Sequence, residues 1–261
     1  MLEDTLYILV SFIATVTGAL TGIGGGIVLK TFVDAFSNDP IVIVSFYTTI
    51  VVFTMCIVSI YKQLRKGFQF NSKVLFGVSL GSIIGGYLGE YLLNIVVQSY
   101  NQQQVQLTQS IILFIVLIFL ILYTKIGRKK NKVEKASLSL TFLLGLFLGG
   151  ISIFLSIGGG PLNISLFVII LGYRMKDAAI YSIATVFFSQ ISKIISIIFV
   201  GSYGQFNLKL TPILILIAIA GGYIGTTLNQ KLSNKKIEYM YMLLMKGLSI
   251  MVLINIFKYW S

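Results

Sequence analysis

Hydrophobic residues gather in eight long runs separated by short polar segments. Six runs have the roughly 20 residues that an α-helix needs to cross a bilayer, and two are longer. One long run followed by three shorter runs is an order that occurs twice. The runs cover Thr5–Phe36, Ile41–Tyr61, Val74–Val97, Val105–Tyr123, Leu138–Leu171, Ala178–Val200, Leu210–Leu228 and Ile237–Phe257. This pattern predicts an all-α polytopic membrane protein.

Three consecutive glycines interrupt each of the two long runs. Glycine loses the most backbone entropy on ordering, and Pro161, after the second triplet, lacks an amide proton, so each run should be two helical arms joined by unwound backbone. Unwound backbone is tolerated in hydrocarbon only where it is buried in protein or lines a polar cavity, so both triplets are candidate substrate-binding segments. The alternative is that these glycines only let helices pack closely. They are Gly24, Gly25, Gly26, Gly158, Gly159 and Gly160.

Short motifs of the first half recur in the second half at a nearly constant separation. An Ile-Gly-Gly-Gly motif recurs after 134 positions, a Gly-Gly-Tyr-Leu/Ile-Gly motif after 136 and a Ser-Thr pair after 137. The motifs begin at Ile23 and Ile157, at Gly85 and Gly221, and at Ser45 and Ser182. We therefore predict two four-segment repeats in one membrane domain, residues 1–124 and 137–261, joined by a basic cytoplasmic connector at residues 125–136.

The relative orientation of the repeats depends on the path of the interrupted runs. If each run crosses the membrane once, the repeats are parallel; if each turns back as a re-entrant hairpin, the repeats are inverted. Hairpins put 15 loop Lys and Arg residues on one side and 2 on the other, whereas eight crossings give 12 and 5. Because cytoplasmic loops are rich in Lys and Arg, charge favours inverted hairpins. First arms of about 20 residues could also span the bilayer, which leaves eight crossings as an alternative.

Composition agrees with a membrane location, since 56% of the residues are hydrophobic, 11% are charged and the mean hydropathy is +0.93. The net charge of +12 arises mostly from Lys and Arg in short loops, which is a topology signal rather than a nucleic-acid-binding surface. Acidic residues lie within Met1–Asp4, where a cleavable signal peptide would carry basic ones.

The chain has one cysteine, Cys56, and no histidine. A single thiol forms neither an internal disulfide nor a redox pair. Without histidine, a Ser-His dyad, a His-ligated metal and a His-ligated haem are excluded. A GxxxxGK[ST] nucleotide motif is also missing from the sequence. We expect no metal and no cofactor, and this inventory favours transport over catalysis.

Three lysines lie inside the apolar runs, where an unpaired charge is costly. Lys30 follows the first triplet by one helical turn, and Lys193 lies mid-run, one turn after Gln190. We expect the side chains of Lys30, Lys193 and Gln190 to bind an anion. The alternative is that the two lysines extend to the membrane interface. Lys246, beside Gly247, has no polar cluster around it and is expected either to extend to the membrane interface or to form a structural ion pair.

Two carboxylates, Glu90 and Asp34, also lie in apolar runs. The counterpart of Glu90 in the second repeat is Thr226, so Glu90 is not a symmetric ligand. It is a candidate proton relay or a partner for a lysine, or it simply lies at the outer end of its span. Asp34 precedes an Asp-Pro pair and is expected at the membrane interface.

Uncharged hydrogen-bonding side chains follow both interruptions. Asn163 comes two residues after the proline of the second break, and a Ser-Thr pair lies in the run after each interrupted run. Serine and threonine often only pack helices, but their shared position makes these candidates for substrate binding. The pairs are Ser45 with Thr48 and Ser182 with Thr185. Helix N-termini, hydroxyls and ammonium groups with few carboxylates suit a small oxyanion.

The segments Gly22-Ile-Gly-Gly-Gly26 and Ile157-Gly-Gly-Gly-Pro161, each followed by an apolar arm, resemble the sulfite exporter TauE/SafE family of bacterial membrane proteins. Gly172-Tyr-Arg-Met-Lys-Asp-Ala178, leading to Ile183-Ala-Thr185, is similar to that family's turn into its next span. The resemblance covers nearly the whole chain and implies a transporter of sulfite, organosulfonates or related anions in the bacterial plasma membrane. The first break departs from the pattern, because Lys30-Thr31 stands where members often have a proline.

We therefore expect a secondary transporter that moves a small anion by alternating access around two glycine-rich breaks. We expect transport to be coupled to an ion gradient, with protons as the coupling ion, or to be driven by the anion's own gradient. The bilayer is the surrounding medium, and no nucleic acid is expected as a partner. One alternative is an intramembrane enzyme, such as a phosphate-binding acyltransferase, although the chain is poor in general bases. Another is a membrane scaffold subunit, which predicts that the glycines and lysines tolerate substitution.

Overall fold

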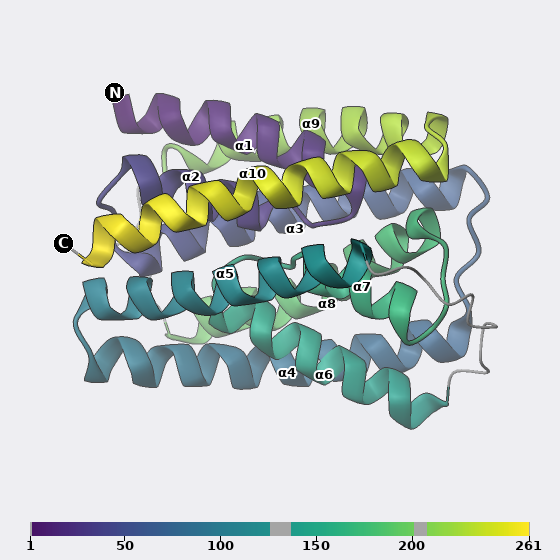
Figure 1. The fold of residues 1–261 in the computed structure, drawn as a ribbon, viewed down its shortest axis with the longest axis horizontal. Helices are drawn as coiled ribbons and strands as arrows, with labels where there is room; N and C mark the ends of the chain where they lie inside the picture. Colours follow the sequence, from purple (N-terminus) through teal and green to yellow (C-terminus); the bar gives the residue numbers. More distant parts are fainter. Residues whose placement is uncertain (1, 126–136, 201–207, 261) are drawn as a thin grey trace.

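The computed structural model describes residues 2–125, 137–200 and 208–260. These residues form ten α-helices and no β-strand, and the helices lie side by side in an elongated bundle (Figure 1). The helices are α1 (Leu2–Thr21), α2 (Gly26–Phe36), α3 (Ile41–Arg65), α4 (Ser72–Ser99), α5 (Gln102–Lys125), α6 (Leu138–Phe154), α7 (Pro161–Ile169), α8 (Met175–Val200), α9 (Thr211–Lys231) and α10 (Asn234–Trp260). The predicted basic connector lies outside the described residues, apart from its first residue at the end of α5.

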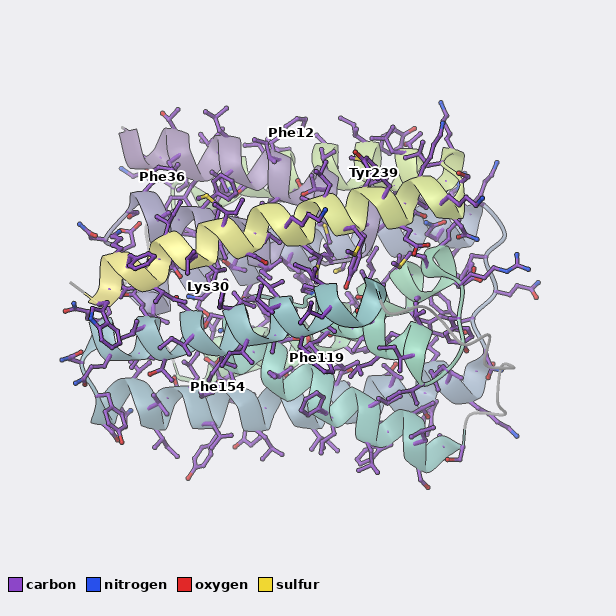
Figure 2. All side chains as sticks on the ribbon, in the orientation of Figure 1. Phe12, Lys30, Phe36, Phe119, Phe154 and Tyr239 are labelled. Carbon is purple, nitrogen blue, oxygen red and sulfur yellow. The ribbon has the colours of Figure 1, made fainter. Side chains whose placement is uncertain are left out.

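Seven of the described helices are long and apolar enough to cross a membrane, which confirms the prediction of an all-helical, multi-pass membrane protein. They are α1, α3, α4, α5, α8, α9 and α10. The other three, α2, α6 and α7, are arms of the interrupted runs. Figure 2 shows apolar side chains, Phe12 and Phe119 among them, projecting from the long sides of the bundle. Such a surface suits the lipid tails of a bilayer.

Both predicted helix breaks are present. The first separates α1 from α2, and the second separates α6 from α7. Gly24, the first glycine of one triplet, and Gly159, the middle glycine of the other, have φ angles of 91° and 104°, in the left-handed region that residues other than glycine rarely adopt. The triplets therefore supply backbone angles that end one helix and start the next.

Each interrupted run turns back on itself near the middle of the bundle. In Figure 1, α1 runs from the end that holds both chain termini toward the middle, and α2 returns to that end. In the same view α6 enters from the opposite end, and α7 returns there. Contacts with α10 agree: Asn255 donates to the Thr31 carbonyl of α2 (3.0 Å), and Tyr241 donates to the Pro161 carbonyl at the start of α7 (2.9 Å). The two broken segments thus approach each other from opposite ends.

Glycines bring two pairs of helices into close contact. Gly85 of α4 lies against the backbone of Leu146 in α6, and Gly225 of α9 lies against the backbone of Val16 in α1. A side chain at either glycine would collide with a backbone carbonyl group. The Gly-Gly-Tyr motif that recurs in both halves therefore serves helix packing, the usual role of small residues in membrane bundles.

The described basic residues of the loops and helix ends lie mostly at the end opposite the chain termini. At that end α3 ends, α4 and α8 begin, and α9 is followed by α10 (Figure 1). The residues there are Lys62, Arg65, Lys66, Lys73, Arg174, Lys176, Lys231, Lys235 and Lys236. Lys209, before α9, and Lys258, near the end of α10, lie at the other end. Such an asymmetry is typical of a membrane protein with one cytoplasmic face.

Candidate functional site

The two glycine breaks, far apart in sequence, touch each other inside the bundle. A Cβ atom on Gly24 would lie 2.9 Å from the carbonyl oxygen of Gly158. Gly26 lies against the carbonyl group of Ile157 and the methyl group of Thr48. All the glycines of both triplets are buried. A larger residue at this contact would push the two breaks apart.

Two short helices begin at this contact. The N-cap residue of α2 is Gly25, and the N-cap residue of α7 is Gly160. Neither residue has a side chain that could accept a hydrogen bond from the first-turn amides. Because the N-terminal end of a helix carries partial positive charge, two uncapped ends that converge favour negative charge between them.

Polar side chains beside the breaks have unused hydrogen-bonding capacity. Thr48 on α3 and Gln190 on α8 are buried, and the Thr48 hydroxyl and the Gln190 Oε1 atom have no hydrogen-bond partner among the described residues. Thr48 lies next to Gly26, and the Gln190 Nε2 atom lies 3.0 Å from where a Cβ atom on Gly158 would be. Buried polar atoms are nearly always satisfied, so these two atoms are available to hydrogen-bond a small molecule at the contact.

Asn163 is also buried, and within the described part of the chain both polar atoms of its side chain are unsatisfied. It lies in the first turn of α7 and lines a narrow apolar space with Leu113 of α5 and Ser152 of α6. The second break lines the same space through Ile157, Gly160 and Pro161, so Asn163 lies between this break, α5 and α6.

The two Ser-Thr pairs have different surroundings. Ser182 donates to the carbonyl oxygen of Gly22 (2.6 Å), which ties α8 to the first break. Thr185 donates to a carbonyl group of its own helix (2.9 Å). Ser45, by contrast, accepts a hydrogen bond from Lys193. The pair in the second half therefore has backbone partners, whereas Ser45 belongs to a polar cluster.

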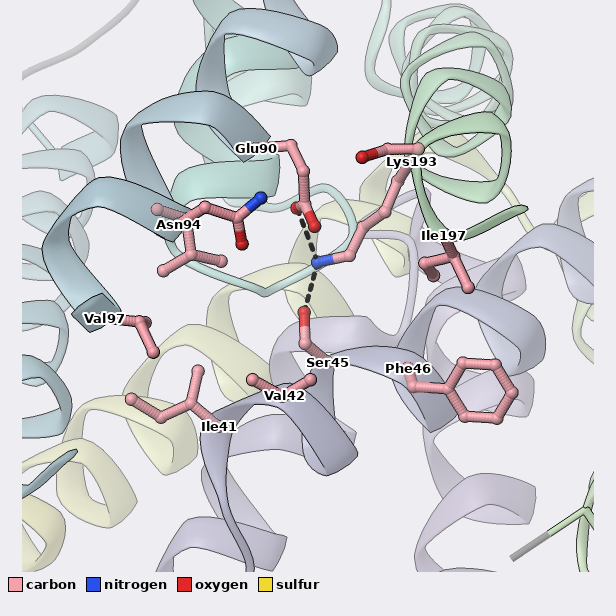
Figure 3. A pocket seen from close by; sticks show the side chains of 11 residues that line it. Ile41, Val42, Ser45, Phe46, Glu90, Asn94, Val97, Lys193 and Ile197 are labelled. Atoms are coloured by element: carbon pink, nitrogen blue, oxygen red, sulfur yellow. Dashed lines mark hydrogen bonds and ion pairs between the residues drawn. The ribbon is translucent and has the colours of Figure 1, made fainter. Parts of the chain in front are cut away.

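A buried ion pair joins α8 to α4 near the breaks. The Nζ atom of Lys193 lies 3.1 Å from a carboxylate oxygen of Glu90 and also donates to the Ser45 hydroxyl, as Figure 3 shows. The Lys193 and Glu90 side chains are 4% and 12% exposed. Desolvation of two charges is offset only where the partners are close and further hydrogen bonds are made, and Ser45 supplies one. Glu90 therefore neutralises Lys193, one of the roles predicted for it.

A cavity of about 70 Å³ adjoins this ion pair (Figure 3). It is lined by the first turns of α3 and the last turns of α4 and α8, at the end of the bundle that holds the chain termini. Ser45 and Lys193 lie one helical turn from Thr48 and Gln190, so polar side chains continue from the cavity to the glycine breaks. The polar residues that line this cavity are Ser45, Glu90, Asn94, Lys193 and Ser196.

Sequence reasoning misses Asn94 and Ser196. Asn94 follows Glu90 by four positions, and Ser196 follows Lys193 by three. Residues at these spacings share a helix face. The polar positions one turn from each predicted charge were therefore the sequence signal that could have identified Asn94 and Ser196.

Lys30 forms a second buried ion pair, with Asp34 on the same helix. The Nζ atom lies 2.7 Å from a carboxylate oxygen of Asp34, and the two side chains are 3% and 2% exposed. Asp34, expected at the membrane interface, is enclosed by protein, and its carbonyl oxygen accepts hydrogen bonds from Lys258 (2.9 Å) and Tyr259 (3.0 Å). This pair lies along α2 and does not line the cavity next to Lys193.

Lys246 differs from the other two lysines. It lies near the middle of α10, its side chain is exposed, and it has no hydrogen bond or ion pair with any residue that the structure describes. Its neighbour Gly247 has nothing within 4 Å of its Cβ position. The expected structural ion pair at Lys246 is therefore not formed within the described chain.

Comparison with known proteins decides the family. The sequence profile of the sulfite exporter TauE/SafE family matches residues 7–252. The chain belongs to this family. TauE/SafE proteins are transporters rather than enzymes, so membership confirms the predicted membrane transporter and gives no support to the acyltransferase alternative.

Two relatives of this TauE/SafE chain are named as membrane transporters. A probable membrane transporter protein of Methanocaldococcus jannaschii is 26% identical over 252 residues, which cover 90% of each chain. The probable membrane transporter protein YunE of Bacillus subtilis is 24% identical over 264 residues, 89% of this chain and 90% of YunE. No solved structure matches the chain significantly. The family implies a transported anion as substrate.

Proposed function

We propose that this TauE/SafE protein transports a small sulfur oxyanion, such as sulfite or a sulfonate, by alternating access. The main support is the contact between the two breaks, where two uncapped helix N-termini converge. Sulfite and sulfonates present several oxygens at once, which suits a set of amide, hydroxyl and ammonium donors. In this proposal the triplet amides, Thr48, Gln190 and Lys193 contact the anion, and Ser45 orients Lys193.

The other predicted site residues receive supporting roles in this proposal. Ser182 fixes the backbone of the first break, and Thr185 stiffens α8 beside it. Lys30 neutralises Asp34 and holds α2 in place. Asn163 keeps free hydrogen-bonding groups at the start of α7, where the anion could pass after the bundle changes conformation.

We infer that the chain contains two inverted repeats, residues 1–124 and 137–261, each a re-entrant hairpin followed by three spans. The approach of the two broken runs from opposite ends supports this arrangement (Figure 1). By the positive-inside rule the basic end then faces the cytoplasm, and the cavity next to Lys193 faces the outside of a bacterial plasma membrane. Rocking of one set of helices against the other would expose the breaks to each side in turn.

Glu90 offers a route to proton coupling. Because it neutralises Lys193, an arriving anion and Glu90 compete for the same ammonium group. A proton taken up by the Glu90 carboxylate removes its charge and leaves Lys193 to the anion. Loss of that proton on the other side restores the ion pair and expels the anion. One proton would thus accompany each anion in the same direction.

Purified protein in liposomes tests the substrate. We expect faster uptake of labelled sulfite or methanesulfonate than of chloride, and a Lys193→Met/Glu90→Gln variant, which leaves no buried unpaired charge, should lose about tenfold or more of the sulfite flux. Lys246→Met removes an ammonium group outside the site and should keep wild-type flux. Sulfite uptake no faster than chloride uptake would contradict a sulfur oxyanion as the substrate, and full flux in the double variant would place the anion site away from Lys193.

A pH-sensitive dye inside the same liposomes tests the coupling. Glu90→Gln keeps the size and polarity of the side chain but cannot take up a proton, so sulfite-driven proton movement should disappear while sulfite–sulfite exchange continues. Glu90→Asp should retain both. Proton movement that persists in Glu90→Gln would assign coupling to another group.

A further inference from the structure

A second groove lies at the basic end of the bundle, between α3 and α9. Its volume is about 330 Å³. One wall comes from the last two turns of α3 and its C-cap residue. The other wall comes from the last turns of α9. The groove is lined by Val58, Tyr61, Lys62, Arg65, Lys66, Tyr223 and Gln230. It is therefore at the opposite end from the cavity next to Lys193.

The charge of this groove is all of one sign. Lys62, Arg65 and Lys66 contribute three cations, and the groove has no carboxylate among its lining residues. The Nζ atom of Lys62 donates to the carbonyl oxygen of Tyr223 (3.1 Å) and to the hydroxyl of Thr227, which fixes one cation at the α3–α9 junction. Arg65 and Lys66 are exposed, with nothing of opposite charge in the groove beside them.

The groove is amphipathic along the bundle axis. The Arg65 guanidinium group lies 5.5 Å from the ring centre of Tyr61, and the tyrosine rings of both helices form its walls. Val58 gives the groove an apolar lining residue one turn closer to the middle of the bundle. Ile219, one turn before Tyr223 on α9, is an exposed apolar side chain just beyond the lining residues. Tyrosines flanked by cations on one side and apolar residues on the other are typical of the membrane–water interface.

We propose that this groove binds an anionic phospholipid, with the headgroup phosphate at Arg65 and Lys66 and an acyl chain along Val58 and Ile219. Basic pockets between helices at a membrane surface select anionic headgroups, and each cation near that surface adds to the attraction. A lipid held there bridges α3, which carries Ser45 and Thr48, to α9. The proposal rests on the membrane location alone and is independent of the transported anion.

Lipid titration into detergent-solubilised protein tests this site, with the midpoint of thermal unfolding as the readout. Phosphatidylglycerol should stabilise the wild type saturably, whereas phosphatidylcholine should not. Arg65→Gln/Lys66→Gln keeps the Lys62 contacts and should bind phosphatidylglycerol about 30-fold more weakly. The matched control, Lys235→Gln/Lys236→Gln, removes the same charge from exposed positions of α10 at the same end and should behave as the wild type.

Three results would overturn the assignment. Equal stabilisation by both lipids would mean that only acyl chains bind. Equal loss in the two double variants would mean that the whole basic end attracts lipid without a defined site. Full stabilisation by soluble glycerol 3-phosphate would replace the lipid with a free phosphate ligand. The assay contains no transported substrate, so failure here and failure of the transport proposal are distinguishable.

Discussion

Three lysines at membrane depth have different surroundings, and the difference decides what each substitution should do. Lys30 and Lys193 are buried opposite carboxylates, whereas Lys246 is exposed and has no ion pair within the described residues. The sequence identifies all three charges but not their surroundings. Asp34 is one helical turn from Lys30, whereas Glu90 reaches Lys193 only because α4 packs against α8, which periodicity does not encode.

Removal of Lys193 alone should be destabilising, because Glu90 then remains buried without its counter-charge. We expect Lys193→Leu to lower the free energy of unfolding by about 3–5 kcal/mol, and Lys193→Leu/Glu90→Leu to recover most of this loss. Lys246→Leu should leave stability unchanged or raise it, since it removes an unpaired charge from an exposed position. Thermal unfolding in lipid nanodiscs measures all three. Equal destabilisation by the single and double variants would show that the charges do not interact.

At the scale of elements, sequence reasoning locates the helices and both breaks well, because apolar run length and glycine triplets are local signals. It cannot find which helices pack together. The recurring Gly-Gly-Tyr motif indicates a repeat, but only the structure shows that Gly85 faces α6 and Gly225 faces α1. Of the predicted site, Thr48 and Gln190 lie beside the triplets and Lys193 lies one turn from Gln190, while Lys30 pairs with Asp34 along α2. Side-chain direction at the ends of short arms depends on tertiary contacts.

The packing role of the glycines can be tested with a matched pair. A methyl group at Gly85 would collide with the Leu146 carbonyl oxygen, so Gly85→Ala should cost about 1–3 kcal/mol of stability. Gly247, also helical, has nothing within 4 Å of its Cβ position, so Gly247→Ala should be neutral or slightly stabilising. The readout is the same nanodisc unfolding midpoint. A stable Gly85→Ala variant would contradict the close α4–α6 contact.

For the whole molecule, charge and helix direction both support the proposed inverted topology. The described basic residues gather at one end, and the two broken runs enter from opposite ends (Figure 1). The sequence alone left eight crossings open, because an arm of about 20 residues is long enough to span a bilayer. In the structure α1 has 20 residues and ends at the first break near the middle of the bundle (Figure 1).

Cysteine accessibility tests this topology in cells. In a Cys56→Ser background, cysteines at Asn101 and Leu208 should react with a membrane-impermeant maleimide from outside, and a cysteine at Ser233 should react only after permeabilisation. The three positions lie in or beside the described turns after α4, before α9 and after α9. Eight crossings instead predict external labelling at Ser233 and protection at Leu208.

The central claim is that the meeting of the two glycine breaks forms the path of the anion, and sulfite flux through two glycine variants tests it most directly. Gly159→Leu places a side chain against Val186 at the contact, and Gly247→Leu places the same side chain at an open position on α10. With equal amounts of folded protein in the liposomes, we predict that Gly159→Leu abolishes sulfite flux and that Gly247→Leu retains it. Undiminished flux through Gly159→Leu would contradict the account.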